Sequence, residues 1–220
     1  DLHHAADRQA VGVMNVSALC KKVIGTLAIA SAALGATGCG EFVRSSRSPS
    51  QLVIESLEAA SGASSAATFG TTLESDVVTI VNNGATVFSD AGRVSLRLML
   101  RDPGAPGIAA TPSAINQVTI TRYRIVYRRA DGRNTPGVDV PQPFDSALTV
   151  TVPTDGDVRA GFEFVRHAAK EEAPLFGLRN SAVTISTIAE VTFYGHDQAG
   201  NEVSVTGSIG VIFGNFADPS

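Results

Sequence analysis

The stretch Val191-Thr-Phe-Tyr-Gly-His-Asp-Gln-Ala-Gly-Asn-Glu-Val-Ser-Val205 decides the fold class of this chain. Apolar Val191 and Phe193 alternate with more polar residues, and the alternation resumes at Val203 after a short Ala-Gly-Asn segment. Successive side chains of a β-strand point to opposite faces, so each half has one face suited to a core and one suited to water. Glycine and asparagine tolerate the positive φ values of tight turns. The stretch therefore predicts a β-hairpin.

The same period-two pattern recurs upstream, for example from Val94 to Leu100 and from Tyr123 to Tyr127. About seven short strands separated by Asn-Gly and Asp-Gly turns predict an all-β fold, an antiparallel β-sandwich. A closed barrel is the alternative. No alternation of strands with helices occurs, which argues against a doubly wound α/β enzyme fold. The expected strands are 76–82, 94–101, 117–129, 147–152, 159–166, 182–196 and 202–213.

The hairpin resembles the last two strands of bacterial immunoglobulin-like and fibronectin-III-like modules. In those modules a strand ends in an Asp-x-x-Gly-Asn turn, which here would be Asp197 to Asn201. The resemblance implies an immunoglobulin-like sandwich and carries no function. The cysteine pair and core tryptophan of true immunoglobulin domains are missing, since the chain has no Trp and its two cysteines are Cys20 and Cys39. The whole chain also resembles uncharacterised bacterial secreted lipoproteins, which implies no known activity.

Near the N-terminus, Lys21-Lys22 precede an apolar run from Val23 to Leu34, and small residues then lead to Cys39. These are the features of a secretory signal peptide. The run is shorter than the about 20 residues that span a bilayer. Because it ends on a cysteine, the segment resembles the bacterial lipoprotein signal. That resemblance implies export to the cell envelope (periplasm or outer membrane) and attachment of a lipid to Cys39. An ordinary secretory signal cleaved nearby is the alternative.

A short helix is expected between the signal and the strands. Ser50 is a suitable N-cap, an apolar face starts at Leu52 and continues at Leu57, and Gly62 is a natural stop, which together predict a helix over 51–60. The Gly-, Ala-, Ser- and Thr-rich residues 61–72 predict a linker. The expected parts are 1–38, an extension before Met14 followed by the signal peptide; 39–72, a lipid-anchored spacer with the helix; 73–216, the β-sandwich; and 217–220, a tail.

Charge and cysteine content exclude some functions. With Cys20 inside the signal and Cys39 at its end, no disulfide is expected within the folded body. The net charge is −4 and the pI is about 5.5. Affinity for nucleic acid that is independent of base sequence depends on neutralising phosphates, so an acidic chain is a poor candidate for it. No cofactor is expected.

The strongest local charge feature is Arg122, Arg124 and Arg128, which strand parity places on one outer face together. We call these three residues the arginine stripe. Such a stripe is a possible binding surface for anionic glycans, lipid head groups or an acidic partner. The alternative is pairing across strands with outward carboxylates, for which Glu163 and Glu190 are available.

Two metal sites are conceivable, and neither has a recognised spacing. His167, His196 and Asp197 contain zinc-ligand types, but nothing in the sequence places the two histidines together. Asp197, Asn201 and Glu202 offer oxygen ligands for calcium, although one turn supplies too few of them. The simpler interpretation is a hairpin turn in which Asp and Asn bond their own backbone, so no metal site is expected.

Catalytic chemistry has little support, because the chain contains no Gly-x-Ser-x-Gly motif. A pair of catalytic carboxylates has no local signature, so one could lie among Asp139, Asp145, Asp155 and Asp157. Asp155-Gly-Asp157 is more simply a turn. The segment from Asn134 to Phe144 contains three prolines, which predict an extended loop that covers a strand edge or binds a partner.

These features predict a non-enzymatic lipoprotein that is attached to the membrane through Cys39 and acts as an accessory or interaction module of a larger envelope assembly. The expected partner is another envelope protein. The alternative is a surface module that binds an anionic glycan or another external ligand.

Overall fold

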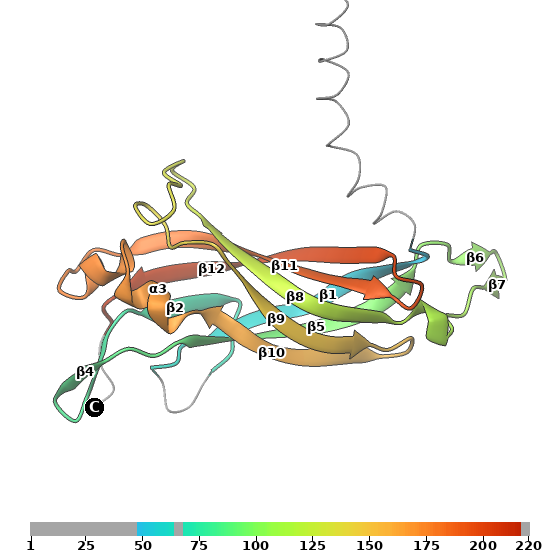
Figure 1. Cartoon of the computed structure of the whole chain (residues 1–220), viewed down its shortest axis with the longest axis horizontal. Coiled ribbons are helices and arrows are strands. Elements are labelled where there is room, and N and C mark those ends of the chain that lie inside the picture. Colours follow the sequence, from blue (N-terminus) through green and yellow to red (C-terminus); the bar gives the residue numbers. More distant parts are fainter. Residues whose placement is uncertain (1–47, 64–67, 217–220) are drawn as a thin grey trace, which may run out of the picture. The chain divides into compact units, whose positions relative to one another are not determined.

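Most of the described chain is β-strand. The structure, a computed structural model, describes residues 48–63 and 68–216, which we call the β-domain. Two main sheets pack face to face (Figure 1). The first has the order β1 (Ser50–Ala60), β5 (Asp90–Leu100) and β10 (Asp157–Val165). The second has the order β2 (Thr72–Asp76), β12 (Glu202–Gly214), β11 (Ile185–Asp197), β8 (Val118–Arg128) and β9 (Phe144–Val152). The expected all-β class is confirmed.

Short elements complete the β-domain. Two small hairpins pair β3 (Thr79–Val81) with β4 (Gly84–Thr86) and β6 (Gly104–Ala105) with β7 (Ile108–Ala109). The helical elements are η1 (Ala114–Asn116), α3 (His167–Glu171) and η2 (Leu175–Leu178).

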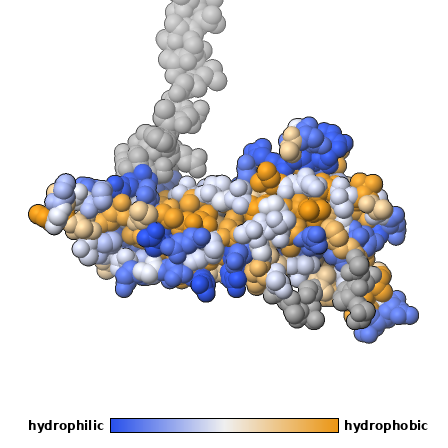
Figure 2. All heavy atoms as spheres, turned by 180° about the vertical axis from the view of Figure 1, so that it is seen from behind, coloured by the Kyte–Doolittle hydropathy of each residue, from blue (hydrophilic) through white to orange (hydrophobic). Residues whose placement is uncertain are grey.

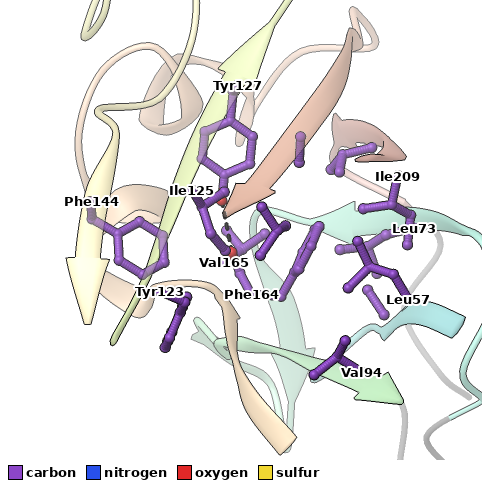
Figure 3. Close-up of a cluster of buried hydrophobic side chains, with 14 of the residues drawn as sticks. Leu57, Leu73, Val94, Tyr123, Ile125, Tyr127, Phe144, Phe164, Val165 and Ile209 are labelled. Atoms are coloured by element: carbon purple, nitrogen blue, oxygen red, sulfur yellow. Dashed lines mark hydrogen bonds between the residues drawn. The ribbon is translucent and has the colours of Figure 1, made fainter. Parts of the chain in front are cut away.

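The core lies between the inward faces of the two main sheets and is built from aliphatic and aromatic side chains (Figure 3). Two tyrosines of β8 reach across it. The Tyr123 hydroxyl donates to the Glu163 carbonyl at 2.9 Å, and the Tyr127 hydroxyl donates to the Phe164 carbonyl at 2.8 Å. Both acceptors are on β10, so these bonds join the two sheets and satisfy polar groups that would otherwise be costly to bury.

The period-two pattern is confirmed in β8, β11 and β12, whose buried residues alternate with more exposed ones. One feature differs from the expected antiparallel arrangement. β2 pairs with β12 in parallel, from Thr72 opposite Gly210 to Asp76 opposite Gly214. The second sheet is therefore mixed, and the two main sheets together contain eight strands rather than about seven.

The predicted helix over 51–60 is wrong, because these residues form β1 and pair antiparallel with β5. A β-bulge between Ile54 and Ser56 explains the error. The extra residue reverses the parity of the strand, so Leu52 and Leu57 both face the core although they are five positions apart. Apolar Val53 and Ile54 lie four and three positions before Leu57, and this spacing imitates a helical face. The first strand of the β-domain consequently begins at Ser50, well before the expected start of the β-sandwich at 73.

The β-domain has two distinct ends, because β5 runs its whole length from Asp90 to Leu100. Ser50 pairs with Leu100, so β1 begins at the end where β6 and β7 project (Figure 1). We call this the hairpin end. Asp90 lies at the opposite end, together with α3 and η2, which we call the helix end. The predicted signal, the lipidation site Cys39 and the tail 217–220 lie outside the described residues.

Candidate binding surface

The arginine stripe lies on the outer face of β8, as strand parity predicted. Each of its arginines is paired with a carboxylate. Arg122 Nη1 lies 2.8 Å from Asp145 Oδ1, and Arg124 donates to the other oxygen of Asp145. Arg128 Nε lies 2.7 Å from Glu190 Oε2. The arrangement therefore matches the pairing alternative, with three guanidinium groups facing two carboxylates.

Glu163, the other expected partner, lies on β10 in the opposite sheet, where it pairs with Ala91 of β5. Asp145 of β9 takes its place, since β9 is the neighbour of β8. Strand parity gives the face on which a side chain lies but does not reveal which strands are neighbours. The pairs are half-exposed, and pairs of this kind contribute on the order of 0–1 kcal/mol. An anionic ligand could displace them at little cost.

One aromatic ring extends the arginine stripe. The Arg122 guanidinium stacks over the Tyr194 ring at 3.8 Å from its centroid. Tyr194 lies directly opposite Arg122 in the pairing of β11 with β8. A guanidinium over an aromatic face is a favourable cation–π contact and holds the side chain in one orientation. The outer sheet face is therefore a preformed polar surface.

The loop 129–143 connects β8 to β9 and projects beyond the sheet (Figure 1). It is held by its own residues. The Arg129 amide donates to Asn134 Oδ1 at 2.6 Å, and the Asp131 carboxylate accepts from Arg129 and Arg133. The hydrogen bond from Arg129 is the main cause of the lowered pKa of Asp131. Loops of this length are often functional, and this one is internally ordered.

The proline-rich part of this loop has an inward and an outward valine. Val140 is buried, whereas Val138 is 67% exposed. The Val140 carbonyl accepts from the Gly137 amide at 2.8 Å, which closes the turn that presents Val138. The turn of the loop therefore carries an exposed apolar side chain.

The helix end contains a buried ion pair that the sequence does not reveal. Lys170 of α3 and Asp90 of β5 have fully buried side chains, and Lys170 Nζ lies 2.9 Å from Asp90 Oδ1. The ammonium also donates to the Asp76 carbonyl at 2.8 Å. Asp90 further accepts from the Ser75 hydroxyl at 2.6 Å and from the Gly62 amide at 2.9 Å. The pair thus links α3 to β5, to the end of β2 and to Gly62.

Burial raises the pKa of Asp90, while Lys170 and the hydrogen bonds to the carboxylate act in the opposite direction. Because both charges have partners, the cluster has the character of a structural brace rather than a reactive site. From the sequence alone, Asp90-Ala-Gly92 predicts an exposed turn. Only a partner 80 positions away in the chain shows that Asp90 is buried.

The conceivable zinc site is not assembled. His167 begins α3 at the helix end, whereas His196 and Asp197 close β11 at the hairpin end, opposite Val118 and Thr119. Asp197 is buried, and its carboxylate accepts from the Ala199 amide at 3.0 Å and the Asn201 amide at 2.8 Å. These bonds belong to the hairpin turn. Across residues 48–63 and 68–216, no group of three or more His, Cys, Asp or Glu side chains could hold a metal ion.

The four aspartates considered as a catalytic pair are likewise dispersed. Asp139 lies in the 129–143 loop and Asp155 in the turn between β9 and β10. Asp145 pairs with the arginine stripe, while Asp157 lies on the other main sheet and accepts from the Ser95 hydroxyl at 2.6 Å. The fold does not bring these four carboxylates to one place.

No family model and no curated protein matches the chain. Among the residues that the structure describes, no helix is long and apolar enough to cross a membrane.

Proposed function

We propose that this protein is a lipid-anchored, immunoglobulin-like module of the cell envelope that binds a protein partner and does not catalyse a reaction. The lipoprotein-like segment that ends at Cys39 supports the anchor. The two facing sheets and the hairpin with the Asp197 to Asn201 turn support the immunoglobulin-like class. Arg122, Arg124 and Arg128 are paired with carboxylates, and the four candidate catalytic aspartates are dispersed, which favours binding over chemistry.

The observation that carries the proposal is that the first described residues lie at one end of the β-domain, whereas three of its longer connections lie at the other end. The β-domain begins at Ser48, at the hairpin end, nine positions after Cys39. The 129–143 loop, the β3–β4 hairpin and the segment 166–184 lie at the helix end. Sandwich domains present binding loops on a rigid scaffold in this way. A tether at one end leaves the loops of the other end available to a partner.

The helix end also exposes apolar side chains. Val138 is 67% exposed, Val183 is 64% exposed and Phe176 is 55% exposed. Exposed apolar residues within a polar rim are typical of protein interaction surfaces. A lipid anchor would confine the search for a partner to the membrane surface and raise its effective concentration, so a modest affinity would suffice. The partner that fits is another protein held at the same membrane.

The test is a detergent-solubilised pull-down of the native protein from its own membranes, with intact-mass analysis of the bait. The proposal expects an acylated Cys39 and a co-purifying protein in stoichiometric amount. The double variant Val138→Asp/Val183→Asp should lose that protein. The matched control Thr149→Asp/Thr151→Asp, on the exposed face of β9, should keep it. A bait without lipid and without a partner would refute the proposal.

A second candidate function is the binding of an anionic glycan at the arginine stripe. The observation that favours it is the imbalance of three arginines against two half-exposed carboxylates. Arg124→Glu combined with Arg128→Glu should then abolish binding to an anionic glycan array. Unchanged binding would eliminate this candidate.

A further inference from the structure

The hairpin end carries a projection whose chemistry differs from the loops of the helix end. β6 and β7 form a short hairpin in which Ala105 pairs with Ile108. Pro106 and Gly107 make its turn, and Gly107 has a φ of 82°. Proline followed by a glycine of positive φ is characteristic of a type II turn. The chain then continues through η1 back to β8. We call the whole segment, residues 101–116, the projection.

The tip of the projection is apolar and exposed. Ile108 is 75% exposed, more than any other large apolar side chain of the β-domain for which exposure is known, and Ile115 is 61% exposed. Residues 103–117 contain no Asp, Glu, Lys, Arg or His. Figure 2 shows apolar colour at the tip that extends at the left edge. Transferring this tip out of water would bury Ile108 without dehydrating a charged side chain, while Ile115 lies in η1 beside Asn116, at the base of the projection.

The projection starts where the chain enters the β-domain. The Arg101 amide donates to the Pro49 carbonyl at 2.9 Å, and the Ser50 hydroxyl donates to the Asn116 carbonyl at 2.8 Å. Both ends of the projection are therefore bonded to the first described residues. The nine positions from Cys39 to Ser48 span at most roughly 30 Å when fully extended. A lipid on Cys39 would keep the base of the projection within that distance of the bilayer.

We propose that the projection is a membrane-contact element that inserts Ile108, at its tip, into the interfacial region of a phospholipid bilayer. The inference rests on the lipid anchor of the proposed function. The exposed apolar residues of the helix end do not lie near the residues that follow Cys39, since the length of β5 separates the two ends. Insertion would add a second attachment point to the lipid. The β-domain would then stand with its helix end directed away from the membrane.

The absence of Trp from the chain allows a clean test. Ile108→Trp introduces a single tryptophan at the tip, and Val138→Trp introduces a matched one at the helix end, where the exposure is similar. Each lipidated variant is reconstituted into vesicles of phosphatidylethanolamine and phosphatidylglycerol, with and without bromine on the acyl chains. The Ile108→Trp emission should shift to shorter wavelengths and be quenched by the brominated lipid. The Val138→Trp emission should do neither.

Equal emission and quenching of the two variants would overturn the inference. A shifted but unquenched Ile108→Trp emission would also overturn it, because the tip would then contact protein, such as a second copy of this chain. Intact mass of the same samples reports on the anchor separately. If Cys39 carries no lipid, the proposed function has failed. The comparison is then repeated on the Cys20→Ser chain coupled through the Cys39 thiol to a maleimide phospholipid. This experiment still tests whether the projection contacts the membrane.

Discussion

At the helix end the buried Asp90 carboxylate is paired with the Lys170 ammonium, whereas at the hairpin end the equally buried Asp197 is held by hydrogen bonds from Asn201 and Ala199. The pKa values of the two carboxyls move in opposite directions. Burial raises the pKa of Asp90. For Asp197, burial acts in the same sense, but the hydrogen bonds from Asn201, Ser48 and Ala199 outweigh it and lower the pKa.

The two ends also differ in how far apart in the chain their partners lie. Lys170 and Asp90 are separated by 80 positions, whereas Asp197 and Asn201 are separated by four. A local turn forms whenever its own few residues are in place. A buried ion pair becomes favourable only after the surrounding fold has excluded water. The ion pair at the helix end therefore depends on the complete fold, whereas the turn at the hairpin end depends on its own few residues.

The largest effect is expected at the ion pair. Lys170→Met leaves the Asp90 carboxylate buried without a cation and should lower the free energy of unfolding by about 3–5 kcal/mol. Urea denaturation followed by circular dichroism measures the loss. In the double variant Lys170→Met/Asp90→Asn no charge remains to be buried, so part of the stability should return. If the free energy of unfolding of Lys170→Met were within about 1 kcal/mol of that of the parent protein, the ion pair would not have the structural role assigned to it.

The matching change at the hairpin end should cost less. Asp197→Ala removes the acceptor of the Asn201 and Ala199 amides, and leaving buried donors unsatisfied costs about 1–3 kcal/mol. Asp197→Asn keeps one acceptor oxygen and should lose less than Asp197→Ala. Urea denaturation of the two variants measures both values. A loss for Asp197→Ala as large as that of Lys170→Met would remove the distinction between the two ends.

As the pH falls, the contributions of Asp197 and Asp90 to the stability of the fold should change in opposite directions. The lowered pKa of Asp197 means that its contribution is complete above the unfolded value of about 3.9 and is lost as the pH falls through the folded pKa. The raised pKa of Asp90 means that the folded state takes up a proton first, so its contribution grows as the pH falls from the folded pKa toward about 3.9.

Unfolding free energies of the parent protein and of Asp197→Asn, measured from pH 7 to pH 3, test this sign. The variant should lose less stability than the parent at the acidic end of the range. Parallel curves for the two proteins would mean that the Asp197 carboxylate has the same pKa in the folded and unfolded states.

The smallest effect on stability is expected for an exposed pair on the sheet face, which sharpens the contrast with the buried one. Asp145→Asn removes the carboxylate shared by Arg122 and Arg124, and exposed pairs contribute about 0.2–1 kcal/mol. The same change exposes two guanidinium groups, so retention on an anionic glycan column should increase if the arginine stripe can bind such a ligand. Glu190→Gln, which releases Arg128, is the matched control for one arginine instead of two.

Several elements could be predicted because their cause is local. Tyr123, Ile125 and Tyr127 alternate with the arginine stripe, and this alternation alone places the two sets on opposite faces of β8. The hairpin of β11 and β12 follows in the same way from its turn residues. The helix predicted for β1 is wrong, because the bulge breaks the period of two, and Val53 and Ile54 lie four and three positions before Leu57, a spacing that suits a helix.

By itself, the sequence determined the β class, the face of the arginine stripe and the self-bonded turn at Asp197, since each depends on residues within a few positions of one another. It also carries the segment ending at Cys39, on which the proposed anchor rests. Only the tertiary structure decided that Asp145 rather than Glu163 neutralises Arg122 and Arg124. It also decided that β2 joins β12 in parallel and that Asp90 meets Lys170. These contacts join residues far apart in the chain, and their partners are selected by which strands become neighbours when the core excludes water.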